Sequence, residues 1–173
     1  MKKNIFYLIL LLFFTFIFTV FYIGLDKPNF YTPKEVKNKS LEEFTSTELF
    51  SNEQFNSKDI IENNKFSLIN IWSSWCVPCR LEHSVLMDLS GKTNLNIIGL
   101  NYKDKKNNAI KFLNELGNPF TKILTDPDGI ISISLGAYGV PETFLLSNKS
   151  KVIKKYIGPL TNDNILEIIK IIK

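Results

Sequence analysis

The chain has 173 residues, of which 45% are hydrophobic and 22% are charged, and its formal net charge at pH 7 is +4. This length and composition suit one globular domain with an accessory segment. The lysines are scattered and form no basic stripe with interleaved aromatic residues, which argues against nucleic-acid binding. The two cysteines can form a single redox pair, part of a metal site or no functional site, but not a disulfide-dense framework.

The N-terminal 25 residues have the composition of a membrane segment. Lys2 and Lys3 precede an uncharged run over residues 5–25 that is dominated by Ile, Leu and Phe. A helix of about 20 apolar residues spans the hydrocarbon core of a bilayer, and the two lysines favour a cytoplasmic N-terminus with the remainder exported. A cleaved signal peptide is the alternative, but the run is longer than a signal-peptide core and residues 19–24 contain no Ala-x-Ala-like cleavage site. We therefore expect residues 1–25 to be an uncleaved, single-pass anchor.

The residues after the predicted anchor change in character. Residues 26–39 are polar, contain two prolines and are expected to form a tether, and residues 40–173 are expected to form one domain. Within that domain, residues 40–50 fit either a short hairpin or an extended arm. The predicted topology places both cysteines outside the cytoplasm, where thiols become oxidised unless a reductant maintains them.

Hydrophobic periodicity and turn residues predict the elements of the domain. The first half of the domain is predicted to contain a helix over 58–62 with Ser57 as its N-cap, a strand over 66–73, a helix over 77–90 and a strand over 95–102. A helix capped by Asp104 and ending near 116, a strand over 120–124 and a helix over 130–135 follow. The last elements are strands over 142–147 and 151–157 and a helix capped by Thr161. Alternating strands and helices followed by a hairpin predict an α/β fold with a mixed sheet and helices on both faces.

Both cysteines lie at the junction between the strand over 66–73 and the helix that follows it. A C-x-x-C pair at a helix N-terminus can exchange electrons with other dithiols, because the helix dipole and the unpaired amide hydrogens favour a thiolate on the first sulfur. Cys76 is therefore the candidate nucleophile, and Cys79 is the candidate that resolves the mixed disulfide. Pro78 suits a first helical turn, and Trp75 is expected to cover one side of the pair.

Three other uses of the cysteine pair are weaker. A structural zinc site needs four ligands, and the chain offers two Cys and one His, His83. Covalent haem attachment requires His directly after the second Cys, where this chain has Arg80. A purely structural disulfide remains an alternative, although so small a loop contributes little stability. We expect no metal and no cofactor other than a redox-active Cys76–Cys79 disulfide.

Several motifs resemble those of known proteins. The stretch from Phe66 to Cys79 resembles the active-site strand and helix of the thioredoxin superfamily, with Asn70 at the position of the usual buried Asp. The interval from Cys79 to Pro141, which resembles the cis-proline of that superfamily, is longer than in thioredoxin and implies an inserted strand–helix element. Residues 79–83 (CRLEH), 99–104 (GLNYKD) and 139–144 (GVPETF) are similar to the CcmG/DsbE family of membrane-anchored thiol-disulfide oxidoreductases in cytochrome c biogenesis.

This resemblance implies a function and a location. It implies reduction of the Cys-x-x-Cys-His disulfide of apocytochrome c, which allows haem to attach. It further implies re-reduction by a membrane thiol-disulfide transporter of the DsbD or CcdA type, action beside other haem-ligation components, and a catalytic domain on the periplasmic side of the inner membrane. Two rivals remain open: a general extracytoplasmic thiol reductant or oxidase, and a membrane-tethered apocytochrome-binding module whose dithiol is secondary.

The resemblance also implies roles for individual residues. Glu82 is expected to be an acid–base group near the buried sulfur, with a solvated helix glutamate as the alternative. Glu142 is expected to be a second catalytic acid, with an exposed strand residue as the alternative. Pro141 is expected to be cis and to face the disulfide, leaving the Val140 backbone free to pair with a substrate strand; a trans proline is the alternative. Trp75, Val140 and Pro141 are thus the expected substrate-binding residues.

Overall fold

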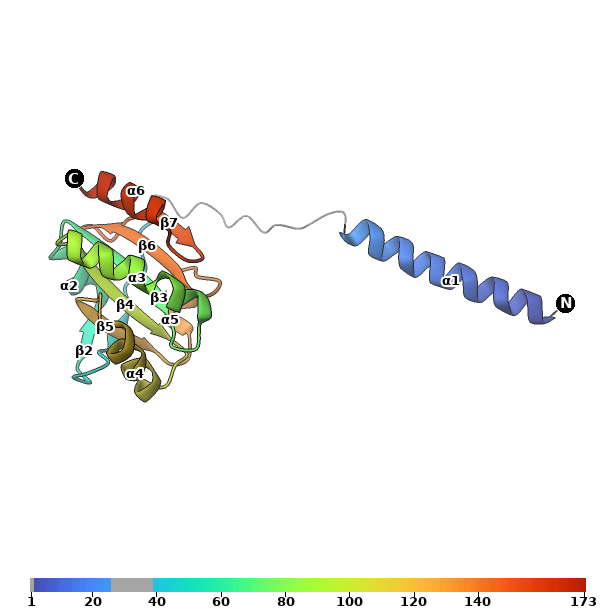
Figure 1. The fold of residues 1–173 in the computed structure, drawn as a ribbon, viewed down its shortest axis with the longest axis horizontal. Helices are drawn as coiled ribbons and strands as arrows, with labels where there is room; N and C mark the ends of the chain where they lie inside the picture. Colours follow the sequence, from blue (N-terminus) through green and yellow to red (C-terminus); the bar gives the residue numbers. More distant parts are fainter. Residues whose placement is uncertain (1, 26–38) are drawn as a thin grey trace. The chain divides into compact units, whose positions relative to one another are not determined.

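The computed structural model of the chain describes residues 2–25 and 39–173, which form two separate units, a helix and a domain (Figure 1). The helix, α1, covers Lys2–Leu25. The expected tether, residues 26–39, lies outside the described residues except for Lys39.

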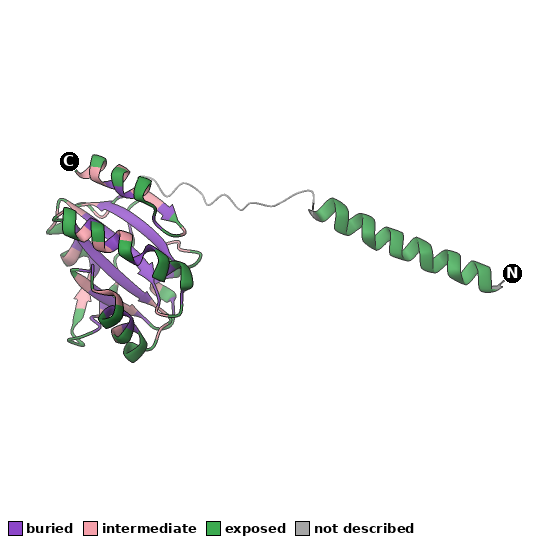
Figure 2. Ribbon diagram, in the orientation of Figure 1, coloured by how far each residue is buried: buried purple, intermediate pink, exposed green. Residues whose placement is uncertain are grey.

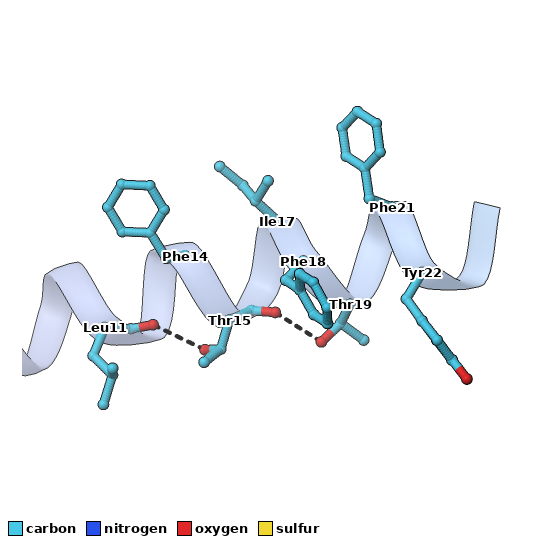
Figure 3. Close-up of a pocket in the computed structure, with 8 residues that line it drawn as sticks. All are labelled: Leu11, Phe14, Thr15, Ile17, Phe18, Thr19, Phe21 and Tyr22. Atoms are coloured by element: carbon cyan, nitrogen blue, oxygen red, sulfur yellow. Dashed lines mark hydrogen bonds between the residues drawn. The ribbon is translucent and has the colours of Figure 1, made fainter. Parts of the chain in front are cut away.

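Helix α1 is long and apolar enough over Lys3–Gly24 to cross a membrane, by length and composition. The two hydroxyl groups in its middle bond to the helix itself: Thr15 Oγ1 donates to the Leu11 carbonyl at 3.0 Å, and Thr19 Oγ1 donates to the Thr15 carbonyl at 2.7 Å (Figure 3). Because these donors have partners inside the helix, they suit a lipid environment that offers none. The helix therefore suits a membrane anchor or a signal sequence.

The domain is built on a five-stranded mixed sheet. Its strands are β3 (Phe66–Trp72), β4 (Asn96–Tyr102), β5 (Lys122–Asp126), β6 (Glu142–Ser147) and β7 (Val152–Ile157). They are arranged in the order β5-β4-β3-β6-β7, with β3, β4 and β5 parallel and β6 antiparallel to both β3 and β7. The mixed sheet predicted from the element order is confirmed.

Helices cover both faces of this sheet. They are α2 (Ser57–Glu62), α3 (Val77–Lys92), α4 (Lys106–Leu116), α5 (Ile130–Ser134) and α6 (Asn162–Ile172). The sheet residues are mostly buried between them (Figure 2). One apolar core contains Leu86 of α3, Phe112 of α4 and Ile168 of α6, and the other contains Ile61 of α2 and Leu135 after α5. The α/β fold with helices on both faces is therefore confirmed.

The segment before α2 is both an arm and a hairpin. The Leu41 amide donates to the Ser150 carbonyl at 2.7 Å, beside the start of β7. Further along, β1 (Thr45–Thr47) and β2 (Gln54–Asn56) form an antiparallel hairpin, and the Leu49 amide between them donates to the Ile123 carbonyl of β5 at 2.8 Å. The segment thus lies along edge strands on both sides of the sheet, where unpaired backbone groups would otherwise be exposed.

Two predicted helix caps are wrong. Asn56, not Ser57, is the N-cap of α2, and its side chain accepts a hydrogen bond from the Lys58 amide. Lys105, not Asp104, is the N-cap of α4 and makes no side-chain cap bond. Both polar side chains have distant partners instead, since Ser57 Oγ accepts from the Phe44 amide and the Asp104 carboxylate accepts from Ser74. The Thr161 cap of α6 is confirmed, with Asn164 completing a capping box.

Candidate active site

The two cysteines form a disulfide at the N-terminus of α3. Cys76 is the N-cap residue, and its Sγ accepts a hydrogen bond from the Cys79 amide at 3.1 Å. Pro78 lies in the first turn, where its missing N–H costs nothing. An amide at a helix start that points at the first sulfur stabilises negative charge there once the disulfide is opened. The arrangement predicted from the C-x-x-C spacing is therefore present.

The disulfide follows the central strand of the sheet. β3 ends at Trp72, and the Ser73 carbonyl then accepts a hydrogen bond from the Cys76 amide at 3.2 Å. Because β3 and β4 are parallel, the segment after β4 begins at the same end of the sheet as the disulfide loop after β3. Trp75 is linked to that segment through its indole N–H, which donates to the Lys103 carbonyl at 3.0 Å, and the residue remains 56% exposed. Trp75 thus presents an aromatic surface directly beside the cysteine pair.

Glu82 is buried, with 1% of its surface exposed, so the alternative of a solvated helix glutamate is wrong. Its Oε1 accepts from the Asn70 side chain at 2.9 Å, and its Oε2 accepts from the Leu160 amide at 2.7 Å. Burial raises the pKa of Glu82 to about 7, while the hydrogen bonds from Leu160 and Asn70 act in the opposite direction. A carboxyl group with this pKa can take up or release a proton near neutral pH.

Pro141 lies next to the central strand. The Val140–Pro141 peptide bond is cis, so the trans alternative is wrong. Pro141 immediately precedes β6, whose first residue, Glu142, is paired with Ile71 of β3. The Pro141 carbonyl accepts a hydrogen bond from the Gly158 amide at 3.0 Å, which joins it to the end of β7. Pro141 therefore lies at the same end of the sheet as the loop that carries the disulfide.

Glu142 is buried as well, so the alternative of an exposed strand residue is wrong. Its Oε1 accepts from the Tyr138 and Gly139 amides at 2.8 and 3.1 Å. Its Oε2 lies 2.7 Å from the Nζ of Lys155, a lysine whose side chain is 8% exposed. These contacts connect the carboxylate to the backbone that leads into Val140 and Pro141. A catalytic role for Glu142 stays a prediction, whereas its hydrogen bonds to this segment are present in the structure.

His83 is inside the domain. Its Nε2 lies 2.9 Å from the Gly117 carbonyl, and its ring packs edge-on against Phe112 with ring centres 4.9 Å apart. Burial lowers the pKa of His83. Within residues 2–25 and 39–173, no group of three or more His, Cys, Asp and Glu side chains is placed to hold a metal ion.

Sequence reasoning missed several residues that hold the site together. They are Ser74, Asn101 and Asp104 near the cysteines, Lys155 beside Glu142, and the Leu160 amide that binds Glu82. The motif over residues 99–104 ends in Asp104 and was a usable signal, but a helix cap explained that Asp equally well. No feature of the sequence pointed to Lys155 as a partner of Glu142, because a lysine in a strand is ordinarily exposed.

Comparisons with known proteins agree with this site. Residues 36–169 match the model of the Redoxin family. The chain is 44% identical over 109 residues to the thiol:disulfide interchange protein CycY of Rhizobium leguminosarum bv. viciae, a match that spans 63% of this chain and 59% of CycY. It is 33% identical over 160 residues to a relative from Pasteurella multocida (strain Pm70) named "Probable thiol:disulfide interchange protein DsbE-2", over 92% of this chain and 84% of that relative.

A solved structure shares the fold. The DsbF homologue from Corynebacterium diphtheriae has a TM-score of 0.68 and 23% sequence identity, and the match covers 83% of this chain and 95% of that one. With the described strand order and the cysteine pair at the start of α3, this likeness identifies the domain as a thioredoxin fold.

Proposed function

Because the chain belongs to the Redoxin family, among its DsbE-type thiol:disulfide interchange proteins, we propose that it is a membrane-anchored thiol-disulfide oxidoreductase of cytochrome c maturation. Its substrate is the disulfide of the Cys-x-x-Cys-His segment of apocytochrome c. The observation that carries this proposal is the Cys76–Cys79 pair at the N-terminus of α3.

The reaction is a two-electron exchange between the protein dithiol and the substrate disulfide. In the reduced protein, the Cys76 thiolate attacks one sulfur of the substrate disulfide, forms a mixed disulfide and displaces one substrate thiolate, which takes up a proton. The Cys79 thiolate then attacks Cys76 Sγ, which closes the Cys76–Cys79 disulfide and releases the second substrate thiolate. The substrate disulfide is reduced by two electrons and the protein dithiol is oxidised by two. The structure has the disulfide form, which is the product of this sequence.

Glu82 serves the second step. Cys79 must lose its proton before it can attack Cys76, and Glu82 lies one helical turn further along α3. Its pKa of about 7 leaves the carboxyl group able to accept that proton near neutral pH. Asn70 donates to Glu82 and thereby orients the carboxylate. We assign Glu82 as the proton acceptor and Asn70 as a residue that positions it.

Glu142 acts on the reaction indirectly, through the backbone of residues 138–141 to which it is hydrogen-bonded. Its bonds to the Tyr138 and Gly139 amides define the path of the backbone into Val140 and Pro141. A substrate strand pairs with the Val140 backbone at this point and packs on Pro141 and the exposed ring of Trp75. Glu142 is in this proposal a positioning residue, with Lys155 neutralising its charge.

The proposed location is supported by α1, which is long and apolar enough to span a membrane. The helix crosses the inner membrane once, with the catalytic domain on the periplasmic side. The oxidised pair is re-reduced there by a membrane thiol-disulfide transporter of the DsbD or CcdA type, and the product dithiol passes to other haem-ligation components. Membrane fractionation should place the full-length chain in the membrane pellet; a soluble form that begins after residue 20 contradicts the anchor.

Replacement of both cysteines separates catalysis from mere binding. Cells carrying Cys76→Ser together with Cys79→Ser should lose cytochrome c maturation and recover it when an external thiol reductant is added. If maturation proceeds normally in the double variant without added reductant and other exported disulfides are unchanged, the protein is an apocytochrome-binding module and the catalytic proposal is wrong. If maturation is normal but other exported disulfides persist, the protein is a general reductant.

A further inference from the structure

The carboxylate of Asp104 holds the residue that lies two positions before the nucleophilic cysteine. Its Oδ2 accepts from the Ser74 amide at 2.6 Å, and its Oδ1 accepts from Ser74 Oγ at 2.8 Å. The same carboxylate accepts from the Asn101 side chain at 3.1 Å and from the Lys105 amide at 2.8 Å. Asp104 follows β4 and Ser74 follows β3, so these bonds join the ends of two adjacent parallel strands, and β3 leads directly into the disulfide.

The neighbouring residue, Trp75, is held by the same turn. Its indole N–H donates to the Lys103 carbonyl at 3.0 Å. Lys103 is in turn fixed by its own amide, which donates to the Asp126 carbonyl of β5 at 2.9 Å. Gly129 packs against this turn with φ of +74°, and a Cβ there would lie 2.5 Å from Tyr102 and Lys103 atoms. The turn over residues 102–105 is thus bonded to β5, and it binds both residues that precede Cys76, Ser74 and Trp75.

We propose that Asp104 is a positioning residue for partner binding. Asp104 fixes Ser74 and, together with the Lys103 carbonyl, sets the orientation of the Trp75 ring. The peptide that flanks the partner's disulfide packs against this ring. This proposal rests on the proposed function, since it concerns how the same site receives its disulfide substrate. Asp104 acts through Ser74 and Trp75, and we assign it no proton transfer.

The two oxygens of a carboxylate are needed for this arrangement. Ser74 donates from both its backbone and its hydroxyl, and hydrogen bonds to an ionised acceptor are stronger than bonds between neutral groups. An Asn side chain has one acceptor oxygen. In Asp104→Asn, therefore, either the Ser74 amide and the Asn101 side chain or the Ser74 hydroxyl and the Lys105 amide lose their acceptor. A loosened Trp75 then has to be ordered when the partner binds, which weakens binding without changing the sulfur chemistry of the bound partner.

The test uses single-turnover kinetics of the reduced full-length protein in detergent with an excess of an oxidised peptide that contains one Cys-x-x-Cys-His segment. The half-saturating peptide concentration then stands for KM, and the limiting rate of dithiol oxidation stands for kcat. We expect Asp104→Asn to raise KM about tenfold, as for the loss of one hydrogen bond to a charged group, with kcat within about twofold of wild type. The NMR signal of the Trp75 indole proton should shift as well. Ser74→Ala removes only the hydroxyl bond and should raise KM less. Asp128→Asn removes the same charge from an exposed residue and is the matched control, expected to leave KM unchanged.

Several results contradict the proposal. An Asp104→Asn protein with the KM and indole signal of wild type overturns it, and so does a fall in kcat at unchanged KM. If Asp104→Asn does not fold, Ser74→Ala decides, since an unchanged KM and indole signal in that variant then overturn the proposal. A wild-type protein that does not reduce the peptide contradicts the proposed function instead, and the indole signals of wild type and Asp104→Asn still show whether Asp104 holds Trp75.

Discussion

The side-chain nitrogen of Asn70 lies 2.9 Å from Oε1 of Glu82, and both side chains are buried. The same nitrogen also donates to Oγ1 of Thr143 at 3.0 Å, so the amide is held between β6 and α3. An Asp at position 70 would bring a second carboxylate against Glu82, and two carboxylates in contact cannot both ionise readily. With an amide there, Glu82 is the titrating group of the network.

Glu82→Gln is expected to remove a pH dependence of stability. Because the pKa of Glu82 is about 7 in the folded protein against 4.5 for the free side chain, the folded state binds this proton more tightly. The resulting stabilisation is complete below pH about 4.5 and is lost as pH rises through about 7, a loss of about 3 kcal/mol.

Urea unfolding of the oxidised protein at pH 4 and pH 8 measures this loss. From pH 4 to pH 8, the free energy of unfolding of wild type should fall by about 3 kcal/mol more than that of Glu82→Gln. The exposed Glu62 provides a matched control, and Glu62→Gln should behave as wild type does. Identical pH dependence in wild type and Glu82→Gln contradicts the raised pKa.

The two cysteines should differ in reactivity once the protein is reduced. Cys76 accepts the amide hydrogen bond at the start of α3, whereas Cys79 lies inside the first turn and is 2% exposed. Alkylation of the reduced protein near neutral pH should therefore modify Cys76 well before Cys79. Mass spectrometry of peptides after a short exposure identifies the modified residue. Equal or reversed reactivity overturns the assignment of nucleophile and resolving cysteine.

Removal of the Glu142 charge should destabilise the domain. Glu142→Gln leaves the Lys155 ammonium group buried without its counter-charge, which costs about 3 kcal/mol. The double variant Glu142→Gln, Lys155→Met removes both charges and should recover much of that loss. Urea unfolding of the two variants at one pH gives the comparison. A single variant within about 0.5 kcal/mol of wild type shows that the pair does not hold the segment before Pro141.

The sequence was sufficient for features that depend on local pattern. The apolar run of β3, the C-x-x-C pair with Pro78 and the Thr161 cap are each specified by neighbouring residues, and the structure confirms them. The family motifs added the cis bond before Pro141, which local pattern does not determine.

Features that depend on distant partners could not be predicted in this way. The Asp104 carboxylate binds Ser74, which lies 30 residues earlier, and the Glu142 carboxylate is neutralised by Lys155 on the neighbouring strand. Asp104 could equally have capped a helix and Glu142 could equally have faced solvent, because the residue type alone does not identify the partner. The same holds for Ser57, whose hydroxyl binds the Phe44 amide rather than capping α2.

The central claim is that Cys76 attacks the disulfide of apocytochrome c, and trapping of the mixed disulfide tests it most directly. In Cys79→Ser the resolving thiol is absent, so the bond between Cys76 and its substrate should persist in cells and survive non-reducing electrophoresis. Mass spectrometry should identify apocytochrome c joined through its Cys-x-x-Cys-His segment, and Cys76→Ser should trap nothing there. If Cys79→Ser traps no apocytochrome c, or if Cys76→Ser traps it equally well, the claim is wrong.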